Sequence, residues 1–290
     1  MIKEWFLAAR PKTLLVGVAP VLAGSALAYA FGKFNWIPAL ICLVFALLAQ
    51  ITSNFVNDYY DFKKGTDRED RLGPERAVAT GKISAKAMWR ATLITISLAL
   101  LVGLSLIYYG GWWLIGVGAL VAVFAFAYSG GPYPLSYHGL GDIAVLIFYG
   151  IVPVVFTYYV QAHDFPVDVW LASIGVGLVG VNVLIVNNYR DMETDAVSGK
   201  RTTVVIFGRE RMALVYLVNC ILAYNLGYAV IGYTSFLWIA VSFPFVIFSV
   251  MLWFKLQSLR GKALNKVLGM TALNVLLFAV CLSIGLIISK

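Results

Sequence analysis

Nine apolar stretches are the strongest constraint on how this chain can fold. Each is long enough to cross about 30 Å of hydrocarbon at about 1.5 Å per helical residue. Only 12% of the 290 residues are charged and 61% are hydrophobic, which is more apolar surface than one water-soluble core of this size would bury. We therefore expect an all-α polytopic membrane protein with nine transmembrane helices, at residues 14–32, 36–56, 87–109, 111–129, 141–162, 167–188, 211–233, 235–254 and 267–289.

The basic residues predict the orientation of these helices. Of 22 Lys and Arg residues, 20 lie in the segments that would share one side of the membrane, and only Lys33 and Lys290 lie on the other. Short cytoplasmic loops retain Lys and Arg, so the N-terminus is expected in the cytoplasm. The net charge of +8 is then a topology signal, and no sequence feature indicates a nucleic acid or an obligate protein partner.

An internal repeat carries polar residues at the ends of two predicted helices. The pattern Asn-x-Tyr-x-Asp occurs at Asn57–Asp61 and again 130 residues later at Asn187–Asp191. From the first copy to the second the chain makes four predicted crossings of the membrane, so both copies should leave the membrane on the same side. We expect one domain over 1–290, with repeat one at about 10–129, repeat two at about 140–254, and the ninth helix, 267–289, as an addition.

The acidic residues of the repeat are candidates for metal binding. Residues four apart share one face of a helix, and carboxylates that converge at the mouth of an apolar bundle need a cation to neutralise them. Oxygen ligands without His or Cys favour Mg²⁺, with Mn²⁺ as an alternative. The predicted metal ligands are Asp61, Asp67, Asp191 and Asp195, and the predicted supporting residues of the catalytic site are Asn57, Asp58, Asn187 and Asn188.

Basic residues near the two motifs are candidates for binding a phosphate-bearing substrate. Magnesium that keeps water in its shell usually shares a phosphate with the protein, and clustered Arg and Lys side chains donate to phosphate oxygens. The predicted substrate-binding residues are Arg10, Lys63, Arg76, Tyr128, Arg190, Lys200 and Arg201. Other charges near the helix ends, such as Lys64, Glu69 and Glu193, are expected to be interfacial anchors.

These motifs resemble the UbiA superfamily of intramembrane aromatic prenyltransferases, whose two aspartate-rich motifs hold a Mg²⁺-bound isoprenyl diphosphate. Further segments resemble the members that prenylate 1,4-dihydroxy-2-naphthoate in menaquinone synthesis: Ala9–Leu14, Lys64-Gly65 between Asp61 and Asp67, Arg71–Pro74 with Arg76–Val78, and Gly199–Thr203. The resemblance implies Mg²⁺-dependent transfer of a polyprenyl group to the naphthoate with loss of CO₂ and diphosphate. It also implies a bacterial cell membrane, with the active site facing the cytoplasm.

One loop departs from the pattern of this family. Relatives often carry a lysine between helices four and five, whereas residues 128–138 contain none. Tyr128, Tyr133, Ser136 or His138 would have to donate hydrogen bonds instead, and His138 is also a candidate general base. The role of Asp142, in the segment Gly139–Asp142, cannot be derived from the sequence. The aromatic residues expected to shelter an allylic cation are Phe55, Tyr59, Phe126, Phe148 and Tyr149.

Two alternatives to this function remain open from the sequence. The same fold and chemistry serve other acceptors, such as 4-hydroxybenzoate, homogentisate, haem or a chlorin, and a glycerol phosphate, and product masses would separate these. A cation or metabolite transporter would also use internal repeats and intramembrane carboxylates. Ionisable residues are nearly absent from the predicted outer side of the membrane. The sequence therefore shows no continuous polar path across the membrane, which disfavours transport.

Overall fold

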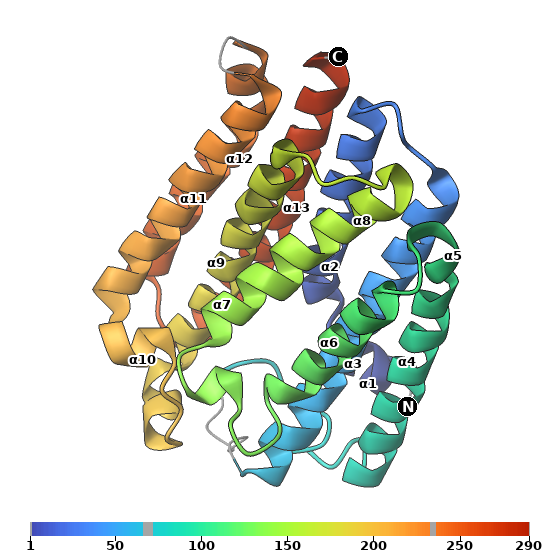
Figure 1. The fold of residues 1–290 in the computed structure, drawn as a ribbon. Helices are drawn as coiled ribbons and strands as arrows, with labels where there is room; N and C mark the ends of the chain where they lie inside the picture. The colour runs from blue at the N-terminus through green and yellow to red at the C-terminus, as the bar shows by residue number, and fades with distance from the viewer. Residues whose placement is uncertain (1, 66–71, 233–235, 290) are drawn as a thin grey trace.

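The computed structural model describes residues 2–65, 72–232 and 236–289, and these residues form helices, turns and bends with no strand among them (Figure 1). The elements are α1 (Ile2–Ala8), α2 (Pro11–Ala30), α3 (Trp36–Lys63), α4 (Ala85–Ser105), α5 (Ile107–Gly110), α6 (Leu114–Ala127), η1 (Leu135–Tyr137), α7 (Gly141–Leu146), η2 (Ile147–Ile151), α8 (Val152–Ala162), α9 (Val167–Val197), α10 (Thr203–Phe207), α11 (Arg209–Ile231), α12 (Phe236–Ser258), η3 (Gly261–Ala263) and α13 (Leu264–Ser289).

The all-α polytopic membrane fold is confirmed, but nine full-length spans are not. Eight helical segments in the described ranges are long and apolar enough to cross a membrane. The predicted span 111–129 is instead α6, an apolar helix of 14 residues. It is about 21 Å long, which is shorter than the hydrocarbon core. The two termini nevertheless lie at opposite ends of the bundle, and α6 runs back along it between α4 and α7 (Figure 1).

The helices that carry the two motifs extend beyond the predicted spans. α3 has 28 residues and α9 has 31, so each is more than 40 Å long. At the start of α3 the side chain of Asn35 accepts a hydrogen bond from the Ile37 N–H at 3.0 Å, which caps the helix. Because both helices exceed the thickness of the hydrocarbon, their final turns bring the motifs to the polar end of the bundle.

α13 packs against α2, α9 and α12 (Figure 1). Buried residues follow one another along it from Leu264 to Leu286. α13 therefore joins a helix of the first half of the chain to helices of the second half. In addition, α3 packs against α4 and α9 packs against α11. The division into two repeats and an added ninth helix stays a prediction.

The fifth predicted span contains a π-helical turn, η2, between α7 and α8. Gly150 of this turn and Gly177 of α9 let the two helices approach closely: a Cβ built on Gly150 would lie 2.3 Å from the Cα of Gly177. Single π-helical turns inside α-helices are frequent at functional sites because they re-aim side chains. Here the turn carries Phe148 and Tyr149, which both line the cavity described below.

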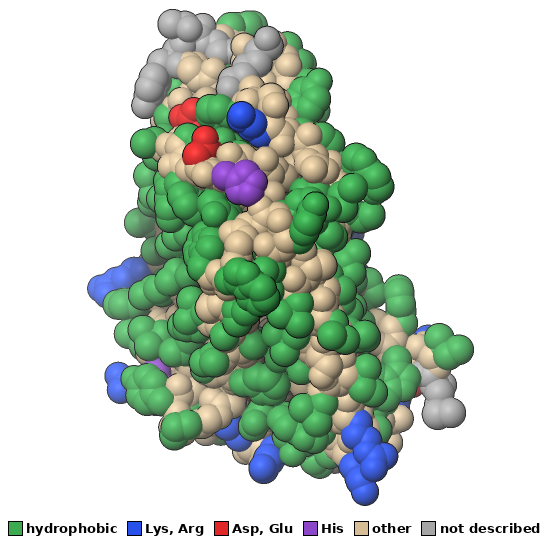
Figure 2. All heavy atoms as spheres, turned by 45° about the vertical axis from the view of Figure 1, so that its right-hand side comes forward, with side chains coloured by type: hydrophobic (Ala, Val, Ile, Leu, Met, Phe, Trp, Pro, Cys, Tyr) green, Lys and Arg blue, Asp and Glu red, His purple; other side chains and the backbone are tan. Residues whose placement is uncertain are grey.

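The outer surface suits a lipid environment. In the face shown in Figure 2, hydrophobic side chains form a broad band, and Lys and Arg side chains gather toward its lower end. Exposed apolar residues such as Leu101, Val123 and Phe243 lie on different helices of the bundle. A water-soluble protein would rarely expose so much apolar surface, so the chain is an integral membrane protein.

Candidate active site

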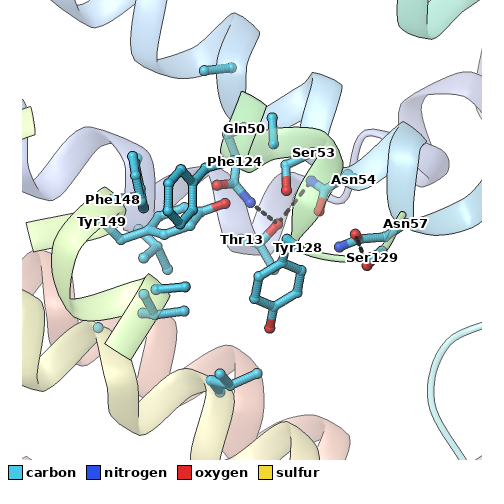
Figure 3. Close-up of a pocket in the computed structure, with 18 of the residues that line it drawn as sticks. Thr13, Gln50, Ser53, Asn54, Asn57, Phe124, Tyr128, Ser129, Phe148 and Tyr149 are labelled. Atoms are coloured by element: carbon cyan, nitrogen blue, oxygen red, sulfur yellow. Dashed lines mark hydrogen bonds between the residues drawn. The ribbon is translucent and has the colours of Figure 1, made fainter. Parts of the chain in front are cut away.

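A single large cavity of about 1130 Å³ contains both motifs. Side chains from α2, α3, α6, η2, α9 and α13 line it, and Figure 3 shows part of its wall. Of the predicted catalytic residues, those that the structure describes line this cavity: Asn57, Asp58, Asp61, Asn187, Asn188, Asp191 and Asp195. Asp67 lies outside the described residues. The cavity brings together side chains that are 130 residues apart in the sequence.

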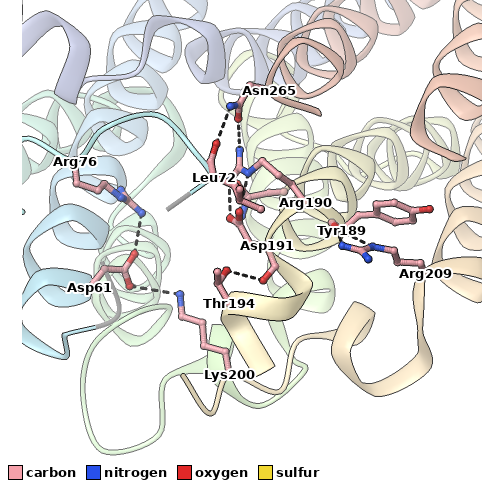
Figure 4. Close-up of polar contacts among 11 residues, drawn as sticks. Asp61, Leu72, Arg76, Tyr189, Arg190, Asp191, Thr194, Lys200, Arg209 and Asn265 are labelled. Atoms are coloured by element: carbon pink, nitrogen blue, oxygen red, sulfur yellow. Dashed lines mark hydrogen bonds and ion pairs between the residues drawn. The ribbon is translucent and has the colours of Figure 1, made fainter. Parts of the chain in front are cut away.

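Asp61 of motif one is paired with basic residues from other segments. Its Oδ2 atom accepts a hydrogen bond from Nη2 of Arg76 at 2.8 Å, and its Oδ1 atom lies 3.7 Å from Nζ of Lys200 (Figure 4). Arg76 comes from the loop that follows α3, and Lys200 comes from the loop that follows α9. An ion pair therefore spans the two repeats.

Asp191 of motif two is paired with its own neighbour in the chain. Nε and Nη2 of Arg190 donate to the two carboxylate oxygens at 2.8 and 2.5 Å (Figure 4). The same guanidinium donates to Asn187 at 2.9 Å and to Asn265 of α13 at 2.7 Å. Arg190 is only 1% exposed. The sequence placed Arg190 among the substrate-binding residues, whereas in this structure its donors hold motif two together.

Asp58 has a contact that the sequence did not indicate. Its carboxylate accepts hydrogen bonds from the backbone N–H groups of Ala77 and Val78, at 3.2 and 3.4 Å. It thereby holds the loop that carries Arg76 against α3. Asn188, at the equivalent position of motif two, is buried and also lines the cavity.

The carboxylates of the two motifs are close enough to interact electrostatically. Asp195 is buried and interacts with both Asp61 and Asp191. Within the described ranges, no three His, Cys, Asp or Glu side chains form a preformed metal site. The oxygen-only donor set nevertheless fits a hard cation such as Mg²⁺, and three carboxylates facing one cavity are a fitting place for it.

The predicted substrate-binding residues divide into two groups. Arg10, Arg76, Tyr128, Arg190 and Lys200 line the cavity. Lys63 and Arg201 are exposed and do not line it; the backbone N–H of Arg201 donates to the carbonyl oxygen of Tyr137 at 3.0 Å. Lys63 and Arg201 are therefore not brought to the site in this structure.

The lysine-free loop between α6 and α7 receives a lysine from α3. Nζ of Lys64 donates to the carbonyl oxygen of Ser129 at 2.8 Å and lies 4.3 Å from the ring centre of Tyr137. Lys200 approaches the same ring at 4.8 Å. Burial lowers the pKa of Lys64, and the nearby Lys200 also lowers this pKa while Asp61 raises it. Lys64 thus fastens the loop, which is more than the anchor role expected of it.

His138 and the aromatic candidates are only partly placed at the cavity. The ring of His138 stacks on Tyr133 at 3.6 Å, and its Nδ1 atom lies 2.9 Å from the Pro134 carbonyl oxygen. His138 does not line the cavity. Phe148 and Tyr149 do line it. The other three aromatic candidates, Phe55, Tyr59 and Phe126, instead pack against tryptophans.

Two groups of residues at the site were missed from the sequence. Asn265 bridges Arg190 and the carbonyl oxygen of Leu72, to which its Nδ2 atom donates at 2.9 Å; no local pattern marks it. Thr13 and Gln50 meet on the cavity wall (Figure 3). A signal for Gln50 was present, since a Gln in the middle of an apolar span is costly and needs a reason.

The fold and the paired aspartate motifs define an intramembrane transferase, and comparison with known proteins agrees. Residues 17–287 match the UbiA prenyltransferase family, and the chain belongs to this family. It is 35% identical to the 1,4-dihydroxy-2-naphthoate octaprenyltransferase of Haemophilus influenzae, over 99% of this chain and 96% of that protein. It is 29% identical to the enzyme of the same name from Bacillus subtilis, over 97% and 91% of the two chains.

Solved structures of the family share the fold at low sequence identity. A UbiA homologue from Archaeoglobus fulgidus bound to DMAPP and Mg²⁺ has a TM-score of 0.66 and 17% identity, and the match covers 97% of this chain and 99% of that one. A homologue from Aeropyrum pernix has a TM-score of 0.70 and 13% identity, over 94% and 97% of the two chains. The prediction of a UbiA-type prenyltransferase is confirmed.

Proposed function

We propose that this enzyme transfers a polyprenyl group from an allylic polyprenyl diphosphate to 1,4-dihydroxy-2-naphthoate, with loss of diphosphate and CO₂, to give demethylmenaquinol. One observation carries the proposal: matched aspartates from α3 and α9 meet in one cavity, each beside basic side chains. The names of the relatives support the naphthoate as acceptor.

The metal would be held by Asp61, Asp191 and Asp195, with Asp67 as the predicted fourth carboxylate. Asn57 and Asn187 offer amide oxygens one helical turn earlier. When bound there, Mg²⁺, or Mn²⁺ in its place, would supply positive charge to offset the negative charge that builds up on the leaving diphosphate. The DMAPP and Mg²⁺ complex of the A. fulgidus homologue supports this assignment.

The diphosphate is oriented by the basic residues of the cavity. Arg76 and Lys200 each contact one carboxylate oxygen of Asp61. When the substrate binds, these two side chains donate charge-assisted hydrogen bonds to phosphate oxygens, in place of their ion pairs with Asp61 or in addition to them. Arg10 and the phenol of Tyr128 also line the cavity and supply further donors. As the allylic C–O bond breaks, its electron pair leaves with the diphosphate, and these donors stabilise the added charge.

The prenyl cation is kept from water by the apolar walls of the cavity. The rings of Phe124 and Phe148 lie 4.0 Å apart on this wall, and an aromatic face attracts a cation by about 0.5–2 kcal/mol. The ring carbon that bears the carboxylate attacks the cation, and a C–C bond forms. The C–CO₂ bond then breaks, and its electron pair returns to the ring and restores aromaticity.

We further propose that the protein lies in a bacterial cell membrane with its N-terminus and active site on the cytoplasmic side. The distribution of Lys and Arg supports this orientation. Leu104 and Ile115 line the cavity and are also about half exposed on the outside of the bundle. A long isoprenoid tail would leave the cavity toward the lipid between their helices, α4 and α6. The repeat boundaries at about 10–129 and 140–254 belong to the same proposal.

The test is mass spectrometry of products formed by the purified enzyme from Mg²⁺, a farnesyl or longer diphosphate, and 1,4-dihydroxy-2-naphthoate. The expected product has the mass of the prenylated acceptor minus CO₂. Prenylation of 4-hydroxybenzoate, homogentisate, a chlorin or a glycerol phosphate in its place would reassign the acceptor. Absence of any prenyl product, together with cation uptake into liposomes that contain the protein, would identify a transporter instead.

A further inference from the structure

A polar stripe continues from motif one down the cavity wall toward the middle of α3. Gln50, Asn54, Asn57 and Asp61 follow each other at intervals of three or four residues, so they share one face of the helix. All four line the cavity. Gln50 lies 11 residues before Asp61, which is about 16 Å along the helix axis. The stripe therefore extends about three helical turns from the predicted metal ligand Asp61.

The second repeat has no such stripe. The residues of α9 that correspond to Gln50, Ser53 and Asn54 at the 130-residue offset are Gly180, Val183 and Leu184. These three also line the cavity. The cavity therefore has one polar wall and one apolar wall below the motifs. Polar groups at this depth are costly, and a site needed only for an isoprenoid tail would not require them.

The orientation of the Gln50 amide is determined by its neighbours (Figure 3). The hydroxyl of Thr13 donates to the carbonyl oxygen of Arg10 at 2.9 Å, so it can only accept from Gln50, whose Nε2 atom lies 3.3 Å away. Asn54 Nδ2 donates to the same hydroxyl at 3.2 Å. The Oε1 atom of Gln50 is therefore directed away from Thr13. It is buried and has no hydrogen-bond partner within the part of the chain that the structure describes.

The π-helical turn carries two aromatic residues, Phe148 and Tyr149, to this part of the cavity wall. The phenol of Tyr149, carried by η2, lies next to the side chains of Ser53 and Gln50. Beside it, the rings of Phe124 and Phe148 are tilted against each other, with an angle of 31° between their planes, so aromatic surfaces adjoin the polar groups (Figure 3). Gln50 is only 7% exposed. A buried acceptor without a hydrogen-bond partner favours a ligand that donates a hydrogen bond to it.

We infer that Gln50, Ser53 and Tyr149 form a binding site for the phenolic hydroxyl of the aromatic acceptor, with Gln50 Oε1 accepting the O–H hydrogen. The inference rests on the proposed function and adds a specificity rule to it. A hydroquinone-type ring donates to Gln50. A quinone of the same shape offers only carbonyl oxygens, and these would face the Gln50 oxygen without a hydrogen between them. The site thus selects the reduced, electron-rich ring, which is the form able to attack a prenyl cation.

The experiment is equilibrium binding without any prenyl diphosphate. The purified protein is titrated anaerobically with 1,4-dihydroxynaphthalene and, separately, with 1,4-naphthoquinone, and binding is followed by calorimetry. For Gln50→Met, which keeps the side-chain length, the Kd of the diol should rise about 5- to 10-fold. The Kd of the quinone should stay within about twofold of the wild-type value. Tyr149→Phe and Ser53→Ala should give the same selective loss with smaller amplitudes.

The matched control is Asn274→Leu. Asn274 is also a buried amide whose Oδ1 atom has no partner among the described residues, but it contacts Ser249 and does not line the cavity. This variant should bind both ligands as the wild type does, even where its melting temperature falls. If Gln50→Met does not fold, Tyr149→Phe and the ligand pair on the wild-type protein carry the test.

Equal weakening of the diol and the quinone, or no change in either, would overturn the inference and leave Gln50 as a link between α2 and α3. These binding results do not depend on turnover. A failure to form any prenylated product would overturn the proposed function while selective binding of the diol still stood. A normal prenyl product together with equal binding of the diol and the quinone would overturn the inference about Gln50 while the proposed function still stood.

Discussion

α3 and α9 carry the same Asn-x-Tyr-x-Asp pattern at the same end of the bundle, yet their aspartates obtain counter-charge in different ways. Asp61 relies on Arg76 and Lys200, which come from two different loops. Asp191 is held by Arg190, the residue before it in the same helix. The position of Arg190 corresponds to Tyr60 in motif one. Because motif two has Arg190 where motif one has Tyr60, Asp191 obtains its counter-charge within its own helix. Asp61 instead obtains counter-charge from the loop residues Arg76 and Lys200.

The difference suggests a division of labour between the motifs. Arg190 makes hydrogen bonds to Asp191, Asn187 and Asn265, and such a fully bonded buried network resists rearrangement. The partners of Asp61 lie in loops, which are easier to move than a helix. We interpret motif two as the rigid half of the site and motif one as the half that rearranges when substrate binds.

The largest expected effect follows from removing either aspartate's charge. Asp61→Asn and Asp191→Asn keep the side-chain shape but delete the anion that would hold the metal. Turnover should fall by orders of magnitude in both, measured as prenyl product per enzyme in detergent. Near-normal Mg²⁺-dependent activity in both variants would rule out the two-motif assignment.

Removal of the metal should abolish activity without unfolding the protein. Arg76 and Arg190 already neutralise Asp61 and Asp191, so the helices do not need a cation to stay together. EDTA should therefore stop product formation, and added Mg²⁺ should restore it. The melting temperature should change by only a few degrees; a collapse of the fold in EDTA would show that the metal is structural.

The two arginines should separate stability from substrate binding. Arg190→Met leaves Asp191, whose side chain is only 13% exposed, without its arginine partner, at a cost of about 3–5 kcal/mol, and the melting temperature should fall by about 10 °C. Arg76→Met leaves Asp61 its second cation, Lys200 at 3.7 Å, so the melting temperature should fall less. The KM for the prenyl diphosphate should rise about 10- to 100-fold, with Arg76→Lys recovering part of the loss. Equal losses of stability in both methionine variants would contradict the division between the motifs.

A smaller effect is expected at the second position of each motif. Asp58→Ala removes the acceptor for the Ala77 and Val78 N–H groups, which should cost about 1–3 kcal/mol of stability. Asn188→Ala in motif two should cost less, because within residues 2–65, 72–232 and 236–289 no backbone N–H of a loop donates to its side chain. Thermal denaturation of the two variants side by side measures the difference, and the reverse order would refute this account of Asp58.

The smallest effect is expected from Glu193→Gln. Glu193 is bonded to Arg209 by two hydrogen bonds at 2.5 and 2.7 Å, but its side chain is 64% exposed. Exposed ion pairs contribute at most about 1 kcal/mol. Activity and melting temperature should both stay close to the wild-type values. A loss of turnover comparable to that of Asp191→Asn would mean that Glu193 belongs to the catalytic site.

Much of the site could be predicted because its signals are local. Matched carboxylates at the ends of two apolar spans are visible in the sequence, and helical periodicity places Asn57 and Asp61 on one face. The pairing of Arg76 with Asp61 and the contact between Asn265 and Arg190 could not be predicted. Both join segments that are distant in sequence, and their partners depend on how the helices pack.

The sequence by itself determined that the chain spans a membrane as a helical bundle and that two repeated motifs meet at one end. Hydropathy and periodicity depend only on residues close together in the sequence, so they can be recognised without knowing how the helices pack. Only the tertiary structure decided which charges neutralise Asp61 and Asp191, that Lys63 and Arg201 do not line the cavity, and that Gln50 lies next to Tyr149. These relations depend on the crossing of helices and on a π-helical turn, and neither is encoded in the spacing of residues along one helix.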